Sequence, residues 1–307
     1  MATSNSYNYT IDRSDVIAEA YEIGGIYSGE TLSSDDTVIA SRKLNLMIKA
    51  WAAQGAHMWA VQEATLFLVK GTASYLLGPT GTHCTASYVR TTLSAAAALG
   101  ATTISLTATT GMTAADNIGI VLDDGTIHWT TITTVATTLI ASGLASAAAS
   151  GNVVFTYTSK IQRPNRIIPD TIYRRDVNDS DVQIELVGRA EYAQLSDKTT
   201  QGKTNKLWYN PLTTNGAASL WLTPDLATDV VRFSFERNVQ DFDVGADEPD
   251  FPIEWGEALV YGLAARLVVG LFPERFNVIQ ALAEQKLSIA LGFDSENVSV
   301  FFAPDSR

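Results

Sequence analysis

The chain has 307 residues, of which 33 are acidic and 21 are basic, and its formal net charge is −12. Its composition, 46% hydrophobic and 18% charged, is typical of a globular protein and excludes a disordered chain. The acidic balance argues against a protein that grips nucleic acid through a basic surface, and the single cysteine, Cys84, excludes an internal disulfide.

The N-terminal part predicts two helices and a hairpin. A short helix is expected over residues 14–23, with Ser14 as N-cap and Gly24 at its end. A longer helix begins at Ser33-Ser34, where a cap precedes two acidic residues, and runs to about Ala53. Residues 65–69 and 75–77, on either side of Lys70-Gly71, predict a hairpin. Since no basic segment precedes an apolar one at the start, we expect no ordinary signal peptide and a chain that stays in the cytosol.

The composition changes in the middle of the chain. Between Cys84 and Thr158 there are only four charged residues: Arg90, Asp116, Asp123 and Asp124. Strand-like runs at 102–107, 117–122, 126–135 and 153–158 are separated by turn signals, of which Asp124-Gly125 is the strongest. We therefore predict an inserted all-β module over residues 81–158.

Strands return after residue 159, with a hairpin turn expected at Asn215-Gly216, and two helices close the chain at 253–272 and 274–291 with Pro273 between them. The predicted fold class is α+β: the terminal helices form a bundle, the interior is a β region, and an all-β module is inserted. The predicted division is a core of residues 1–80 and 159–307, the insert at 81–158, and a C-terminal docking tail at 294–307.

The helix at 253–272 is apolar around most of its circumference, so it must be buried by its own bundle, by partner subunits or by lipid. Charged residues, including Glu257 and Arg266, interrupt a run that barely reaches spanning length, which disfavours lipid. We therefore interpret it as an assembly helix. Arg266 is expected to form a buried pair with Glu257 or with an acid of a neighbouring subunit. The side chains predicted to bind a subunit or partner here are Trp51, Trp255, Tyr261 and Arg266.

No arrangement of residues predicts catalysis. His83-Cys84 has no metal-ligand or nucleophile–base spacing to His57 or His128, and no phosphate-binding glycine loop is present. One acidic run could be a cation site or a paired-carboxylate site, but it lacks a calcium-loop register, which favours a solvated helix-entry loop or a charged contact surface. This acidic loop consists of Asp241, Asp243, Asp247, Glu248 and Asp250. We expect no catalytic residue, no metal and no cofactor.

Three segments carry a resemblance to a known family. They are the entry to the apolar helix, "DFDVGADEPDFPIEWGEALVYGLAARL", the stretch from Ser33 to Gly71, and the tail "SENVSVFFAPD". In pattern and order they resemble the head-to-tail adaptor, or head-completion, proteins of short-tailed bacteriophages. The resemblance covers residues 1–80 and about 159–307, and the middle of the chain departs from it.

The resemblance implies a structural virion protein of the neck and tail, assembled in the host cytoplasm without a membrane partner. Its subunits would form a ring, expected to be twelvefold, that docks under the portal protein after DNA packaging. The ring would seal the channel and carry the tail nozzle protein. Double-stranded DNA would pass through without sequence-specific binding, the tail with Phe301 and Phe302 would engage the portal, and the acidic loop would face the nozzle or the channel.

A second hypothesis is a carbohydrate-binding or cell-wall-acting phage protein. It rests on the Thr/Ser/Ala-rich insert, in which Tyr88, His128 and Trp129 could present an aromatic platform to a sugar. A third interpretation makes the insert a decoration on the outside of the ring that meets the capsid or tail fibres.

Overall fold

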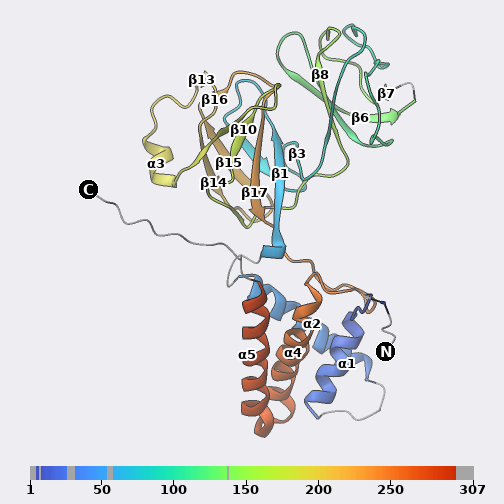
Figure 1. The fold of residues 1–307 in the computed structure, drawn as a ribbon, viewed down its shortest axis with the longest axis vertical. Helices are drawn as coiled ribbons and strands as arrows, with labels where there is room; N and C mark the ends of the chain where they lie inside the picture. The colour runs from blue at the N-terminus through green and yellow to red at the C-terminus, as the bar shows by residue number, and fades with distance from the viewer. Residues whose placement is uncertain (1–4, 7, 26–31, 54–57, 137, 295–307) are drawn as a thin grey trace. The chain divides into compact units, whose positions relative to one another are not determined.

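The computed structural model describes residues 5–6, 8–25, 32–53, 58–136 and 138–294. Its mixture of helices and several sheets confirms the α+β class. The chain divides into two compact units, which we call the helical unit (residues 1–60 and 239–307) and the β unit (residues 61–238) (Figure 1). This differs from the predicted division, which joined the interior β region to the helices and set the insert apart; the predicted tail at 294–307 lies, apart from its first residue, outside the described residues.

The helical unit is built around one central helix, α4 (Gly256–Leu271), which packs against the other three (Figure 1). Those three are α1 (Arg13–Ile23), α2 (Ser34–Ala52) and α5 (Phe276–Phe293), and short 3₁₀ turns are η1 (Met58–Ala60), η2 (Ile253–Trp255) and η3 (Pro273–Arg275). The predicted apolar character of α4 fits this place, since Leu259, Leu263 and Leu267 are all buried.

Local signals explain where these helices begin. Ser33 caps α2 as predicted, its side chain accepting a hydrogen bond from the backbone N–H of Asp36. The N-cap of the first helix lies two residues earlier than predicted, at Asp12 rather than Ser14. The Asp12 carboxylate accepts from the N–H of Asp15 at 2.8 Å, and Asp15 accepts in return from the N–H of Asp12, which completes a capping box.

The β unit contains three larger sheets. The core sheet has the order β11-β10-β17-β1-β3 with β9 also on β17, the second sheet has the order β12-β14-β15-β2, and the insert sheet has the order β4-β8-β5-β6-β7. A two-stranded pair, β13-β16, completes them. The bounds are β1 Val61–Phe67, β2 Ser74–Leu77, β3 Cys84–Thr85, β4 Val89–Thr92, β5 Asn117–Val121, β6 Ile127–Thr134, β7 Leu139–Ile140, β8 Val153–Tyr157, β9 Arg166–Ile167, β10 Tyr173–Arg175, β11 Asp181–Gln183, β12 Glu185–Leu186, α3 Arg189–Gln194, β13 Gln201–Gly202, β14 Lys206–Asn210, β15 Gly216–Trp221, β16 Thr223–Pro224 and β17 Val230–Glu236.

One of the two predicted glycine-containing turns is confirmed. Asp124-Gly125 joins the antiparallel strands β5 and β6, and Gly125 has the positive φ of +80° that such a turn requires. The connection between the antiparallel strands β14 and β15 is longer than the predicted turn at Asn215-Gly216: it spans residues 211–215, and Gly216 is already the first residue of β15.

Two predictions of strands are wrong. The hairpin at 65–69 and 75–77 does not form, because β1 pairs along its length with β17 while β2 pairs with β15 in the second sheet. Residues 102–107 form no strand and make only single bridges, Thr103 to Leu139 and Leu106 to Leu93. In both cases partners distant in sequence decide the pairing.

The insert exists as a sheet of its own, yet it shares a core with the strands outside it. Phe67 of β1 is fully buried against Phe155 and Tyr157 of β8, at ring distances of 4.9 and 5.7 Å. Val230 of β17 joins the same cluster. This shared aromatic core explains why the insert belongs to the β unit.

Candidate assembly surfaces

Two of the predicted partner-binding residues lie inside the helical unit. Trp255 is 0% exposed and Trp51 is 5% exposed, and their rings are 5.9 Å apart. Phe251 and Trp59 extend this cluster, with the Phe251 ring 5.5 Å from that of Trp255. The prediction of a partner-facing role therefore does not fit Trp51 and Trp255, because burial in their own bundle leaves no surface for a partner.

The predicted pair between Arg266 and Glu257 is wrong. The Glu257 carboxylate pairs instead with the Nζ of Lys286 on α5, at 2.5 Å. Arg266 is half-buried, its pKa is lowered by desolvation, and no acidic side chain pairs with it in the described part of the chain. The remaining predicted residue, Tyr261, is also half-buried, with the Lys286 ammonium 5.8 Å from its ring centroid.

The acidic loop is bound to its own helices. Asp241 pairs with Lys49 of α2 at 2.6 Å, and the carboxylate of Asp247 accepts from the N–H groups of Asp243 and Val244. These two hydrogen bonds, together with the charge of Arg13, lower the pKa of Asp247.

Three further contacts close the loop. The Asn45 amide exchanges two hydrogen bonds with the backbone of Phe242, Arg13 donates to the carbonyl of Asp243, and Asp250 accepts from the N–H of Gln240. Asp243 and Glu248 remain exposed. The loop is therefore a folded part of the helical unit, with its remaining acids on the surface. Phe301 and Phe302 lie outside the described residues.

An apolar surface on α5 was not predicted from the sequence. Val278, Leu282, Ile289 and Phe293 follow one another at helical spacing, and Ile289 and Phe293 are each 61% exposed. The neighbouring side of α5, with Ile279, Ala283 and Ala290, packs into the bundle. We call the exposed row the α5 face. Isolated exposed apolar residues are ordinary, but a row of four on one helix is a candidate contact surface.

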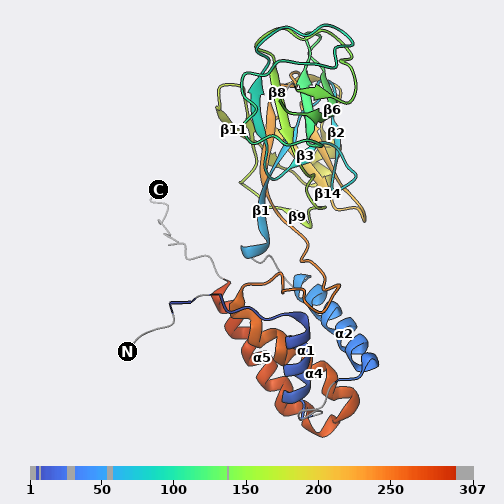
Figure 2. The ribbon, with the colours of Figure 1, turned by 90° about the vertical axis from the view of Figure 1, so that its right-hand side faces the viewer.

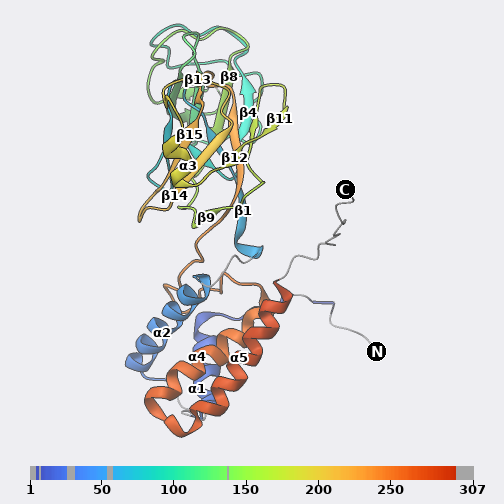
Figure 3. The ribbon, with the colours of Figure 1, turned by 90° about the vertical axis from the view of Figure 1, so that its left-hand side faces the viewer.

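A second apolar surface lies on α2. Val38, Ile39 and Leu46 are exposed, Leu46 by 66%, while Leu44, Met47 and Ile48 of the same helix are buried. We call the exposed set the α2 face. The helices α2 and α5 lie on different sides of α4 (Figures 2 and 3), so the two faces are separate surfaces of one bundle. The periodicity of the sequence does not distinguish the exposed apolar residues of these two faces from the buried apolar residues of the same helices.

Charge is divided unevenly between the two units. The helical unit contains 19 of the 33 acidic residues and eight of the 21 basic ones, so it has a net charge of −11, against −1 for the β unit. Of its acids, Asp15, Glu19 and Glu22 lie exposed along α1 and have no basic partner among the described residues.

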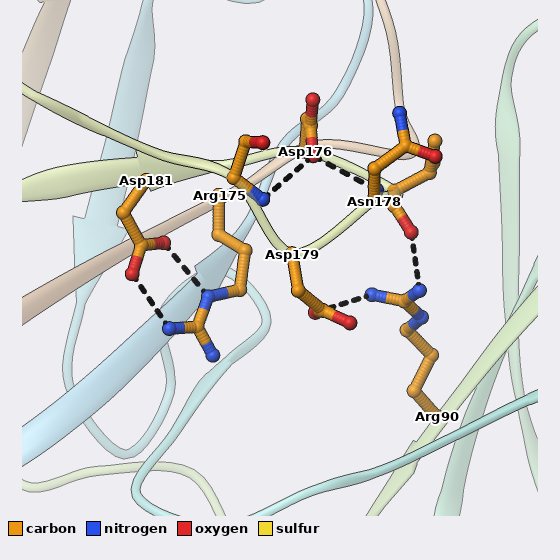
Figure 4. Close-up of polar contacts among 8 residues, drawn as sticks. Arg90, Arg175, Asp176, Asn178, Asp179 and Asp181 are labelled. Carbon is orange, nitrogen blue, oxygen red and sulfur yellow. Dashed lines mark hydrogen bonds and ion pairs between the residues drawn. The ribbon is translucent and has the colours of Figure 1, made fainter.

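In the β unit, by contrast, charges are paired where the insert meets the core sheet (Figure 4). Arg90 of β4 donates to the carboxylate of Asp179 at 3.1 Å and to the carbonyl of Val177, both in the turn between β10 and β11. Arg175 forms a two-point pair with Asp181 at 2.8 and 2.7 Å. The contacts of Arg90 bind this turn to β4, the first strand of the insert sheet, and the Arg175–Asp181 pair joins the two strands that flank it, β10 and β11.

Two of the three residues of the predicted sugar platform, Tyr88 and Trp129, pack against the core sheet, whereas His128 is half-buried beside the hydroxyl of Ser142. The ring of Trp129 stacks on His83 with centroids 3.8 Å apart and joins Phe67 and Tyr88 in the shared aromatic core. His83 also makes a 2.6 Å hydrogen bond to the hydroxyl of Tyr157, and burial, with the charge of Lys160, lowers its pKa to about 4. The rings of Tyr88 and Trp129 therefore pack between the insert and the core sheet and do not form one open platform with His128.

Within the described residues, no group of three potential metal ligands is found, and no helix is long and apolar enough to cross a membrane. Cys84 is fully buried, and desolvation raises its pKa, the opposite of what a reactive thiolate needs. No known protein family matches the sequence, and no curated protein matches it significantly.

Proposed function

We propose that this protein is a structural assembly subunit, the head-to-tail adaptor of a short-tailed bacteriophage, which forms a ring under the portal after packaging and carries the tail nozzle. The observation that supports the proposal best is the presence of two separate apolar faces, on α2 and on α5, in one bundle. Two different faces suit a head-to-tail contact, in which the α5 face of one copy packs against the α2 face of the next. Such heterologous contacts close into a ring when the rotation between copies allows it.

The charge of the helical unit agrees with this function. A ring with a net charge of −11 on each helical unit has little affinity for DNA phosphates, so duplex could pass through it without being held. Arg266 adds a half-buried cation that an acid of a neighbouring copy could neutralise.

Electron microscopy of the protein mixed with packaged, tailless heads of the same phage tests the proposal. We expect a new ring of density below the portal. The double variant Ile289→Asp/Phe293→Asp should abolish the ring, because it places two carboxylates in an apolar contact. As a matched control, Leu99→Asp changes an exposed apolar residue of the β unit and should leave the ring intact. Heads that acquire no density from the wild-type protein would refute the adaptor function.

A further inference from the structure

The helical unit has a groove between α1, α4 and the segment that precedes α1. Its volume is about 720 Å³, and its apolar lining includes Tyr9, Ile11, Ile253, Val260 and Tyr261. Tyr9 and Ile253 are well exposed, while Val260 is buried at the floor. A smaller cavity of about 210 Å³, lined by Tyr9, Ile11 and Ile253 together with Phe251, continues the groove along the same segment.

The border of the groove is acidic. Asp15 and Glu19 of α1 line one side, while Glu257 of α4 on the other side is neutralised by its pair with Lys286, so the unpaired negative charge lies along α1. Glu22 continues the α1 row, since positions 15, 19 and 22 are neighbours on one helix face. Like charges at this spacing repel each other, and the three acids of α1 have no basic partner in the described chain.

From this combination we infer that the groove is a docking site for a basic amphipathic segment of a partner protein. Apolar side chains of that segment would cover Ile253, Val260 and Tyr261, and its lysines or arginines would face Asp15, Glu19 and Glu22. The charge complementarity identifies the occupant, because a basic segment relieves the repulsion along α1 whereas an acidic one adds to it.

This inference gives the chemistry of a partner of the proposed adaptor and rests on that function for its biological meaning. The groove itself belongs to one copy of the helical unit. Binding can therefore be measured on the isolated protein, without heads or rings, and its failure would leave the ring test untouched.

The probe is a fluorescent synthetic amphipathic helix with one leucine face and one lysine face, followed by anisotropy. We expect it to bind the full-length protein, to bind more weakly as salt is raised, and to lose binding when its lysines are replaced by glutamates. Glu19→Lys/Glu22→Lys should weaken binding about tenfold, since two exposed attractions become repulsions. Asp15 is left unchanged because it belongs to the capping box of α1.

Two controls separate the groove from the bulk charge. Glu274→Lys/Glu284→Lys makes the same change of net charge at exposed positions in η3 and α5 and should weaken binding much less. Ile253→Ser removes exposed apolar lining and should weaken binding with no change of charge.

Three results would overturn the inference. The first is absence of binding by the lysine peptide, and the second is equal weakening by the two charge variants, which would mean attraction to the unit as a whole. The third is self-association of the wild-type protein that Glu19→Lys/Glu22→Lys abolishes, which would assign the groove to a second copy.

Discussion

The two units of this protein differ in net charge and in the apolar side chains that they expose. The β unit neutralises its charges locally, with pairs such as Arg166–Glu236, Arg175–Asp181 and Arg232–Glu63, and is nearly neutral overall. The helical unit has a large negative charge and exposes apolar rows on two of its helices. The helical unit, which exposes both acidic side chains and apolar rows, is therefore the one suited to assembly.

The largest effect should follow from removing the centre of the aromatic cluster. Trp255→Ala should lower the free energy of unfolding of the helical unit by about 3–5 kcal/mol, because it leaves a cavity among Trp51, Trp59 and Phe251. Chemical denaturation followed by helical circular dichroism measures it. Trp208→Ala, at a half-buried position of the β unit, is the control and should leave the helical transition in place. An unchanged helical transition in Trp255→Ala would contradict the account of the core.

A second prediction concerns the β unit and pH. His83 ordinarily titrates near 6.5 but near 4 in the folded protein, so between these values the unfolded chain binds more protons than the folded one. The stability contribution is therefore fully present above pH 6.5 and decreases as the pH falls towards 4. Denaturation measured between pH 6.5 and pH 4 should show this decrease in the free energy of unfolding of the wild-type protein. The variant His83→Gln should lack this part of the pH dependence. A profile identical in both proteins would mean that His83 is not buried in the aromatic core.

The smallest expected effect is at the junction of the insert. Arg90→Ala should lower the stability by at most about 1 kcal/mol, because the side chains of Arg90 and Asp179 are 32% and 65% exposed and surface pairs contribute little. Hydrogen exchange of the turn at residues 177–180 is the sensitive measurement and should become faster. If the exchange is unchanged, the aromatic core alone positions the insert.

The sequence predicted what local chemistry determines. The cap at Ser33, the break at Pro273 and the turn at Asp124-Gly125 each depend on residues next to one another, and the structure confirms them. The hairpin predicted for residues 65–69 and 75–77 is wrong, because β2 pairs with β15, which lies more than a hundred residues away in the sequence.

The candidate surfaces were harder to predict for the same reason. Trp255 and Ile289 both lie in apolar helices, and only the packed bundle separates the buried residue from the exposed one. Likewise, Glu257 was expected to pair with Arg266 of its own helix. Its partner is Lys286 of α5, and the sequence of α4 alone could not reveal that pair.

The central claim is that the α5 face of one copy packs against the α2 face of the next. The most direct test is oxidative cross-linking of the double variant Leu46→Cys/Ile289→Cys bound to packaged heads. The native Cys84 is fully buried and should not take part. We predict a ladder of covalently joined copies that continues beyond the dimer, with each single-cysteine variant giving dimers at most. A double variant that gives no species larger than a dimer would contradict the claim.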